Sequence, residues 1–219
     1  MKPIFTFILS LCFVLNTFAQ TGVYVKYDIS IQANGEQAEM MKSMFEGSTM
    51  ELAANADRTW VKSQVGTMMT TEMEMDVAKN EMTMYMGGAM GKMAFRGNAD
   101  KLEDMQGEET ESPNVELLDE TKTILGVVCK KAVIKDEDGN SMSFWYTEEF
   151  ERPEGMEQMP NEIPGLCLEF EMFTEGIKMV YTASAFKDDA NMADYTLTIP
   201  EGVEVQSFDA MKAMGMGGN

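Results

Sequence analysis

Alternation of apolar and polar residues is the dominant pattern of this chain beyond residue 20. The first run places Val23, Val25, Tyr27, Ile29 and Ile31 at every second position, which is the pattern of a strand with one buried face. Further runs predicted as strands are 50–54, 59–65, 73–77, 82–86, 124–134, 142–146, 166–172, 177–185 and 195–199. Because most connections between the runs are short, neighbouring strands are expected to pair antiparallel. The pattern therefore predicts a mainly β fold built on a strongly curved, mostly antiparallel sheet.

Helical spacing is found in two short segments. Between residues 34 and 47 apolar side chains recur at intervals of three and four, and Gly47 can adopt the left-handed conformation that ends a helix. The tail from Ser207 carries Phe208, Met211 and Met214 at similar intervals. The sheet is therefore expected to carry one or two short helices.

Residues 99–120 interrupt the alternation. They carry many acidic residues, Pro113 and little apolar periodicity, a composition typical of a mobile connection. The remaining length of about 200 residues suits one domain. We therefore predict a single β-rich domain over residues 20–219, with a mobile acidic connection at 99–120.

The first 19 residues have the composition of a secretory signal peptide. Lys2 supplies a positive charge, residues 4–15 are mostly apolar, and residues 17–19 resemble a cleavage site that ends at Ala19. No later apolar run approaches the ~20 residues of a membrane-spanning helix. The sequence thus predicts an exported protein, periplasmic or extracellular, without a transmembrane segment.

Histidine is absent from the chain, whereas methionine occurs 24 times. The absence of histidine excludes Ser-His-Asp triads, Cys-His dyads and histidine-based zinc sites. On this basis we predict a protein that is not an enzyme and that uses no cofactor.

The charge of the chain is strongly acidic, with a formal net charge of −20. Such a field repels phosphate backbones, so nucleic acid is not expected as a partner, and a basic partner or none fits better. Short acidic groups such as Glu148, Glu149 and Glu151 are interpreted as solvated charge.

Three short motifs in the second half of the chain are informative together. They are ETKTILGVVCKKAVI at residues 120–134, the residues 145–147, and the residues 163–165. They resemble a secreted bacterial family known as domain of unknown function 4412, although Val127 and Val128 depart from its pattern. The resemblance implies the fold of periplasmic lipoprotein carriers, an open half-barrel whose concave face is capped by helices and accepts acyl chains. It implies no catalytic residues.

The centre of the chain is the region densest in methionine. Met73 and Met75 precede a polar turn, and Met82, Met84 and Met86 follow it. If the two runs pair as a hairpin in the matching register, all five side chains lie on one face. Three interpretations stay open: core packing beneath a helix, an adaptable apolar wall for a ligand, and Cu(I) binding by thioether groups.

The function predicted from these observations is that of a non-enzymatic binding protein. Its apolar concave face would take a lipid-like ligand or an apolar peptide segment of a partner. The candidate ligand-binding residues are Met73, Met75, Met82, Met84, Met86, Leu168, Phe170 and Met179. The alternatives are a methionine-based Cu(I)-binding or oxidant-scavenging envelope-stress protein, and a structural domain without a ligand.

Cys129 and Cys167 are the two cysteines beyond the signal segment. An even number of cysteines in an exported protein makes a disulfide between them a candidate. Cys167 alternates with Glu169 and Glu171, so it is expected on the outer face of its strand.

Asp136, Asp138 and Asn140 occupy the first, third and fifth places of a calcium-loop pattern. The sixth place is Ser141 rather than glycine, and the twelfth is Thr147 rather than glutamate. We therefore interpret the segment as a hairpin turn and predict no metal site.

Overall fold

The computed structural model describes residues 21–32, 36–89, 91–106, 114–135, 139, 141–153, 159–174 and 177–216. The predicted signal peptide, residues 1–19, lies outside these ranges, as do Asp136, Asp138 and Asn140 of the calcium-loop pattern. Among the described residues, no helix combines the length and the apolar composition needed to span a membrane.

Strands make up most of the described chain, which confirms the predicted mainly β fold. They are β1 Thr21–Gln32, β2 Thr49–Ala54, β3 Arg58–Val65, β4 Met69–Asp76, β5 Glu81–Gly88, β6 Gly91–Asn98, β7 Val115–Ile124, β8 Val127–Lys135, β9 Ser141–Thr147, β10 Leu166–Thr174, β11 Ile177–Asn191 and β12 Val205–Ser207. The helices are α1 Glu36–Phe45, α2 Ala99–Gln106, α3 Phe208–Ala213 and the 3-10 helix η1 Met192–Asp194.

All the strands belong to one open sheet with the order β12-β6-β5-β4-β3-β2-β1-β11-β10-β9-β8-β7. Neighbours pair antiparallel except β12 and β6, which are parallel. The long strands β1 and β11 lie in the middle of this order. We call β2–β6 with β12 the first arm, and β7–β10 the second arm.

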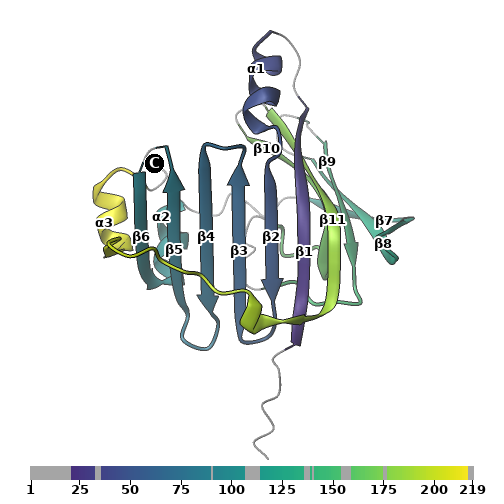
Figure 1. Cartoon of the computed structure of the whole chain (residues 1–219). Helices are drawn as coiled ribbons and strands as arrows, with labels where there is room; N and C mark the ends of the chain where they lie inside the picture. Colours follow the sequence, from purple (N-terminus) through teal and green to yellow (C-terminus); the bar gives the residue numbers. More distant parts are fainter. Residues whose placement is uncertain are drawn as a thin grey trace, which may run out of the picture.

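The sheet bends at β1 and β11, so the inner faces of its two arms pack against each other. Figure 1 shows the first arm facing the viewer and the second arm lying behind β11. One core cluster contains Leu52 and Val61 of the first arm together with Phe144 and Leu168 of the second. Two register shifts in the β1–β11 pairing lie at this bend, and such bulges increase local twist. The concave face is therefore largely a packed interior.

Tyr27 on β1 connects the bend to the second arm. Its side chain is fully buried, and its hydroxyl donates a 2.7 Å hydrogen bond to the backbone oxygen of Cys167 on β10. Its ring meets Phe170 edge-on, with 5.5 Å between the ring centroids. Burial raises the pKa of the hydroxyl well above its ordinary value, so it stays protonated and donates across the physiological pH range.

The environment of Cys167 differs from the sequence prediction. A register shift between Cys167 and Glu169 in the β9–β10 pairing turns Cys167 into the core, where it is completely buried. The expectation that Cys167 shares the outer face with Glu169 is therefore wrong. A bulge adds one residue to a strand, which breaks the simple alternation that the prediction used.

The candidate disulfide is not formed in the structure, where Cys129 and Cys167 are both buried free thiols. They lie on β8 and β10, and β9 runs between these strands. Strands separated by one neighbour are about 10 Å apart, which exceeds the ~7 Å that a disulfide tolerates between Cα atoms. Burial raises the pKa of Cys129 to about 11 and that of Cys167 to about 12, so neither thiol is activated as a nucleophile.

The convex face of the first arm is covered by residues 192–204, which we call the strap. Figure 1 shows it crossing the front of the sheet on its way to β12. Tyr195 stacks on Tyr24 at 4.9 Å between ring centroids and lies 5.6 Å from Trp60. The backbone nitrogen of Leu197 donates to Glu74 at 3.0 Å. The predicted strand at 195–199 is wrong, because this segment buries alternate side chains by lying on a sheet face rather than by pairing.

The segment predicted as a mobile connection, 99–120, contains regular structure on both sides of residues 107–113, which the structure does not describe. Helix α2 begins beside Asn98, whose side chain accepts from the backbone nitrogen of Asp100, and buries Leu102. Strand β7 begins at Val115 and pairs with β8. Both elements bury few apolar side chains. Their acidic sequences therefore lack the apolar periodicity from which a helix or a strand is predicted.

Replacing Tyr27 by phenylalanine tests the contact between the bend and the second arm. We expect Tyr27→Phe to lower the free energy of unfolding by about 1–2 kcal/mol, because a buried hydrogen bond is lost. Chemical denaturation measures the change. The control is Tyr85→Phe on β5, whose side chain is only partly buried; an equal loss in both variants would contradict the role given to Tyr27.

The two thiols should be unreactive in the folded protein. We expect a thiol-reactive disulfide reagent at pH 8 to label neither Cys129 nor Cys167 in the folded protein. After unfolding, the reagent should label both cysteines even when no reducing agent has been added. Their pKa values are raised on folding, so their contribution to stability is complete below about pH 9 and is lost as the pH rises towards 11–12. Replacing both cysteines by alanine should make the free energy of unfolding fall less steeply over this pH range. Tyr27, whose pKa is also raised by burial, contributes to the remaining decline above about pH 10. Failure to label the unfolded, unreduced protein would show a disulfide.

Candidate functional site

The methionine-rich strands form a hairpin in the register that places their sulfur atoms together. Met73 pairs with Met84 and Met75 with Met82, and directly paired residues of antiparallel strands project to the same face. The turn between them contains Asn80 in the left-handed region at φ 49°, a conformation that asparagine tolerates better than most residues. Met86, two residues beyond Met84, extends the same face.

Helices α2 and α3 cover much of this methionine face. Met82 and Met84 are 4% and 7% exposed and belong to a cluster with Phe95, Leu102 of α2 and Phe208 of α3. Met73, Met75 and Met86 are partly buried against the same cluster. For Met82 and Met84 the structure therefore favours core packing over an open wall.

The other candidate residues lie on the opposite side of the concave face. Leu168 and Phe170 of β10 are buried in the large core cluster, and partly buried Met179 of β11 pairs with Ile31 of β1. Met73 is the residue that packs against both clusters. The eight predicted residues thus share one face but divide into two groups, and whether they bind a ligand stays a prediction.

A pocket of about 460 Å³, which we call the end pocket, lies at the end of the sheet where β1 begins. Gly22 and Val23 of β1, Asn55 of the β2–β3 turn, and Asp188 of β11 contribute to it. The segment 149–153, which follows β9, forms the rest of its wall. The end pocket therefore brings together residues that are far apart in the sequence.

The segment 149–153 is held in place by its backbone. The nitrogen of Leu166 donates to the oxygen of Phe150 at 3.1 Å, and Gly165 approaches the oxygen of Thr147 so closely that a Cβ atom would lie 2.1 Å from it. Gly165 has φ +93°, which other residues rarely adopt. Glycine at 165 is thus required for this segment to pack against β10.

Two side chains of this segment have defined contacts. Phe150 meets Phe186 edge-on at 5.1 Å between ring centroids. The guanidinium of Arg152 donates to the backbone oxygen of Met159 at 3.1 Å and to the side-chain oxygen of Asn161. Both residues are therefore positioned by the core and by the following loop.

The end pocket combines carboxylates, one guanidinium and one aromatic ring. Glu149, Glu151 and Asp188 supply hydrogen-bond acceptors, Arg152 supplies donors, and Phe150 supplies an apolar surface. Across the described ranges, no group of three or more acidic or cysteine residues is arranged to hold a metal ion. The pocket therefore offers mainly hydrogen-bond acceptors, together with one donor group and one aromatic ring.

The sequence interpretation of Glu149 and Glu151 as solvated charge did not reveal the end pocket. The residues that line it are separated by more than 160 positions along the chain, from Thr21 to Asp188. The aromatic Phe150 between two glutamates was the one local signal.

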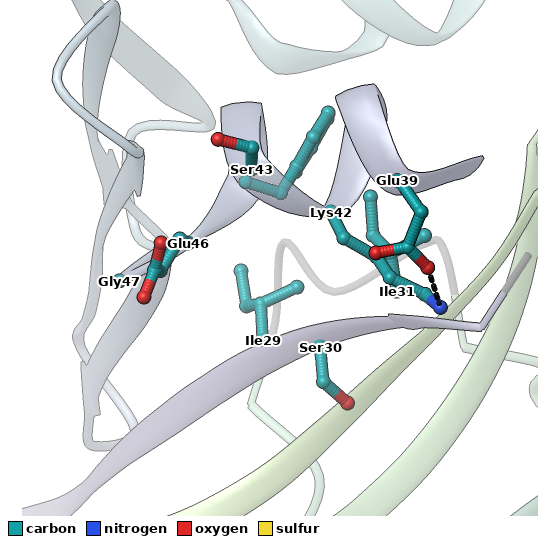
Figure 2. A pocket seen from close by; sticks show the side chains of 9 residues that line it. Ile29, Ser30, Ile31, Glu39, Lys42, Ser43, Glu46 and Gly47 are labelled. Carbon is teal, nitrogen blue, oxygen red and sulfur yellow. Dashed lines mark hydrogen bonds and ion pairs between the residues drawn. The ribbon is translucent and has the colours of Figure 1, made fainter. Parts of the chain in front are cut away.

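A second pocket, of about 500 Å³, lies between α1 and β1 and is called the helix pocket here. Figure 2 shows the side chains of Ile29 and Ile31 directed from β1 towards the helix, while Ser30 points to the other side of the strand. Lys42 and Glu39 form an ion pair of 2.9 Å at the edge of this pocket. Neither pocket is lined by any of the eight candidate residues.

Solved structures with a similar fold include two of the protein PNGF-II. The PNGF-II structure in space group P21 has a TM-score of 0.50 and 17% identity, and covers 89% of this chain and 33% of its own. The structure of the same protein in space group C2 has a TM-score of 0.47 and 16% identity, and covers 90% of this chain and 32% of its own. An uncharacterized conserved protein from Thermus thermophilus has a TM-score of 0.47 and 9% identity, and covers 86% of this chain and 91% of its own. At these identities the likeness shows the fold alone.

The chain spans about a third of the length of the PNGF-II chains. Among the curated proteins, none matches it. The match to PNGF-II therefore concerns one part of a longer protein.

A family model described as "N-glycanase peptide, N-terminal domain" matches residues 37–209. The resemblance to domain of unknown function 4412 is therefore wrong, because the match falls on a different family. The prediction that the chain is not an enzyme is contradicted by the same match, because the family's description names an N-glycanase. The absence of histidine excludes only histidine-based chemistry, so it could not support the wider prediction. The match covers well over half of the chain, which belongs to the family of N-glycanase peptide N-terminal domains.

Proposed function

We propose that this chain takes part in the processing of N-linked glycans and binds the sugar portion of a glycoprotein in its end pocket. The observation that carries the proposal is the lining of that pocket, which combines Glu149, Glu151 and Asp188 with Phe150 and Arg152. Membership of an N-glycanase domain family supplies the substrate class.

The chemistry of a sugar ring suits this lining. Its hydroxyl groups donate hydrogen bonds to carboxylate oxygens and accept them from a guanidinium, and its C–H faces pack against an aromatic ring. A volume of about 460 Å³ falls within the usual range of small-ligand sites. Hydrogen bonds to charged groups are stronger than those between neutral groups, which favours the carboxylates as the main contacts.

We expect an asparagine-linked glycopeptide to bind in calorimetric titration, and the same peptide without its glycan to bind much more weakly. N,N′-diacetylchitobiose should compete with the glycopeptide. The double variant Glu149→Gln, Glu151→Gln should bind the glycopeptide at least about tenfold more weakly, because hydrogen bonds to charged acceptors are lost.

The matched control is Glu201→Gln, Glu204→Gln on the exposed part of the strap, which removes the same charge. It should leave the affinity unchanged. Equal binding by both double variants, or equal binding of the peptide with and without its glycan, would contradict the proposal.

A second candidate function is binding of an apolar chain on the concave face beside Met75. Thr59 pairs with Met75 and projects to the same face, is 3% exposed, and has a hydroxyl without a hydrogen-bond partner among the described residues. Buried hydroxyl groups are normally paired. A polar head group reaching Thr59, with its apolar chain along the partly buried Met73 and Met75, accounts for this arrangement.

We expect Thr59→Val to raise the free energy of unfolding of the ligand-free protein by about 1 kcal/mol, because an unpaired hydroxyl is removed. The same variant should bind oleate more weakly in a fluorescence titration. The control is Thr123→Val on β7, where the threonine is exposed, and it should leave oleate binding unchanged. Oleate binding that is unaffected by Thr59→Val would remove this second candidate.

A further inference from the structure

Exposed methionines gather at the end of the sheet opposite the end pocket. Met40 and Met44 of α1 are 63% and 42% exposed, and Met68 and Met69 at the β3–β4 connection are 37% and 40% exposed. Among the described residues, Met214 is the one other exposed methionine. We call the first four residues the methionine rim.

The two parts of the methionine rim are in contact through the backbone. A Cβ atom at Gly66, in the β3–β4 turn, would lie 2.4 Å from the backbone oxygen of Met44. The nitrogen of Gly66 also donates to the Ser48 hydroxyl, at 2.9 Å, just beyond α1. Figure 1 shows α1 and the β3–β4 turn at the same end of the sheet. The rim is therefore one surface formed by two segments.

The helix pocket lies beside this rim on the same helix, and none of the four rim methionines lines it. Its wall contains Ile29 and Ile31, directed towards α1, and Phe45 from the end of the helix. Large apolar side chains at the centre of an interface carry most of its binding energy when they enter such a recess. The rim supplies a flexible thioether surface next to the pocket, and such a surface can adapt to different apolar partners.

The charge around the rim is acidic. Glu39 and Glu46 are exposed and line the helix pocket, where Lys42 is already paired with Glu39. The whole chain carries a formal net charge of −20. This field repels anionic lipid surfaces and acidic proteins and attracts basic ones.

We propose that the methionine rim and the helix pocket form a docking site for a basic, amphipathic polypeptide helix. Its apolar face would lie on Met40 and Met44 with one side chain in the helix pocket, and its lysine or arginine residues would face Glu39 and Glu46. Apolar residues at helical spacing flanked by basic ones are the pattern that fits a groove of this kind. The site is separate from the end pocket and does not depend on the proposed glycan binding.

The probe is a fluorescent amphipathic helical peptide made of leucine and lysine, titrated into the full chain and followed by anisotropy. We expect Met40→Gln, Met44→Gln to weaken its binding by about tenfold, since contact with two apolar side chains is lost. Glutamine keeps the net charge and the helix propensity nearly unchanged. A loss therefore reports apolar contact rather than the general acidity of the chain.

Met214→Gln is the matched control, because it changes an exposed methionine outside the rim and should leave binding unchanged. A leucine–glutamate peptide should not bind. In the unaltered chain, the bound leucine–lysine peptide should protect Met40 and Met44 from oxidation by hydrogen peroxide and leave Met214 exposed to it.

Equal affinity of the peptide for the double variant and the unaltered chain would overturn the proposal, since binding would then rest on charge alone. Binding to neutral phosphatidylcholine vesicles in place of the peptide would also overturn it. Loss of binding in the double variant together with protection of Met40 and Met44 would establish it.

Discussion

Burial of the two arms of one sheet against each other is the constraint on which this structure depends. A sheet of this length that stayed open would expose the inner faces of both arms to water, and the bend at β1 and β11 removes both at once. The Tyr27 hydroxyl donates to the Cys167 backbone oxygen and so links β1 at the bend to β10 of the second arm. The two described pockets accordingly lie at the ends of β1 rather than between the packed arms.

The distribution of the described pockets follows from this packing. The end pocket and the helix pocket lie at opposite ends of β1, where residues outside the sheet form part of their walls. The methionines have different roles according to where they lie. Met82 and Met84 fill space below α2 and α3, whereas Met40 and Met44 remain exposed. The same flexible side chain serves close packing in one place and adaptable contact in the other.

The sequence predicted the parts of this fold that depend on local alternation. Most of the strands, the antiparallel pairing and the shared face of Met73, Met75, Met82 and Met84 follow from a period of two, and the structure has them. The inward position of Cys167 could not be predicted, since one extra residue in β10 reverses the faces. The end pocket was equally hidden, because its residues meet only after the sheet has bent. The absence of histidine excluded only histidine-based catalysis and histidine-based metal sites. It therefore could not support the prediction that the chain is not an enzyme.

The parallel strand β12 has a consequence for the biogenesis of the chain. Residues 205–213 complete the first arm, because β12 pairs with the edge of β6 and α3 supplies Phe208 and Met211 to the methionine cluster. During synthesis these residues emerge after everything else in both arms. Until then the β6 edge is unpaired and the sulfur-rich surface is uncovered, a state prone to aggregation. The nascent chain thus has a vulnerable interval that lasts until α3 has been synthesised.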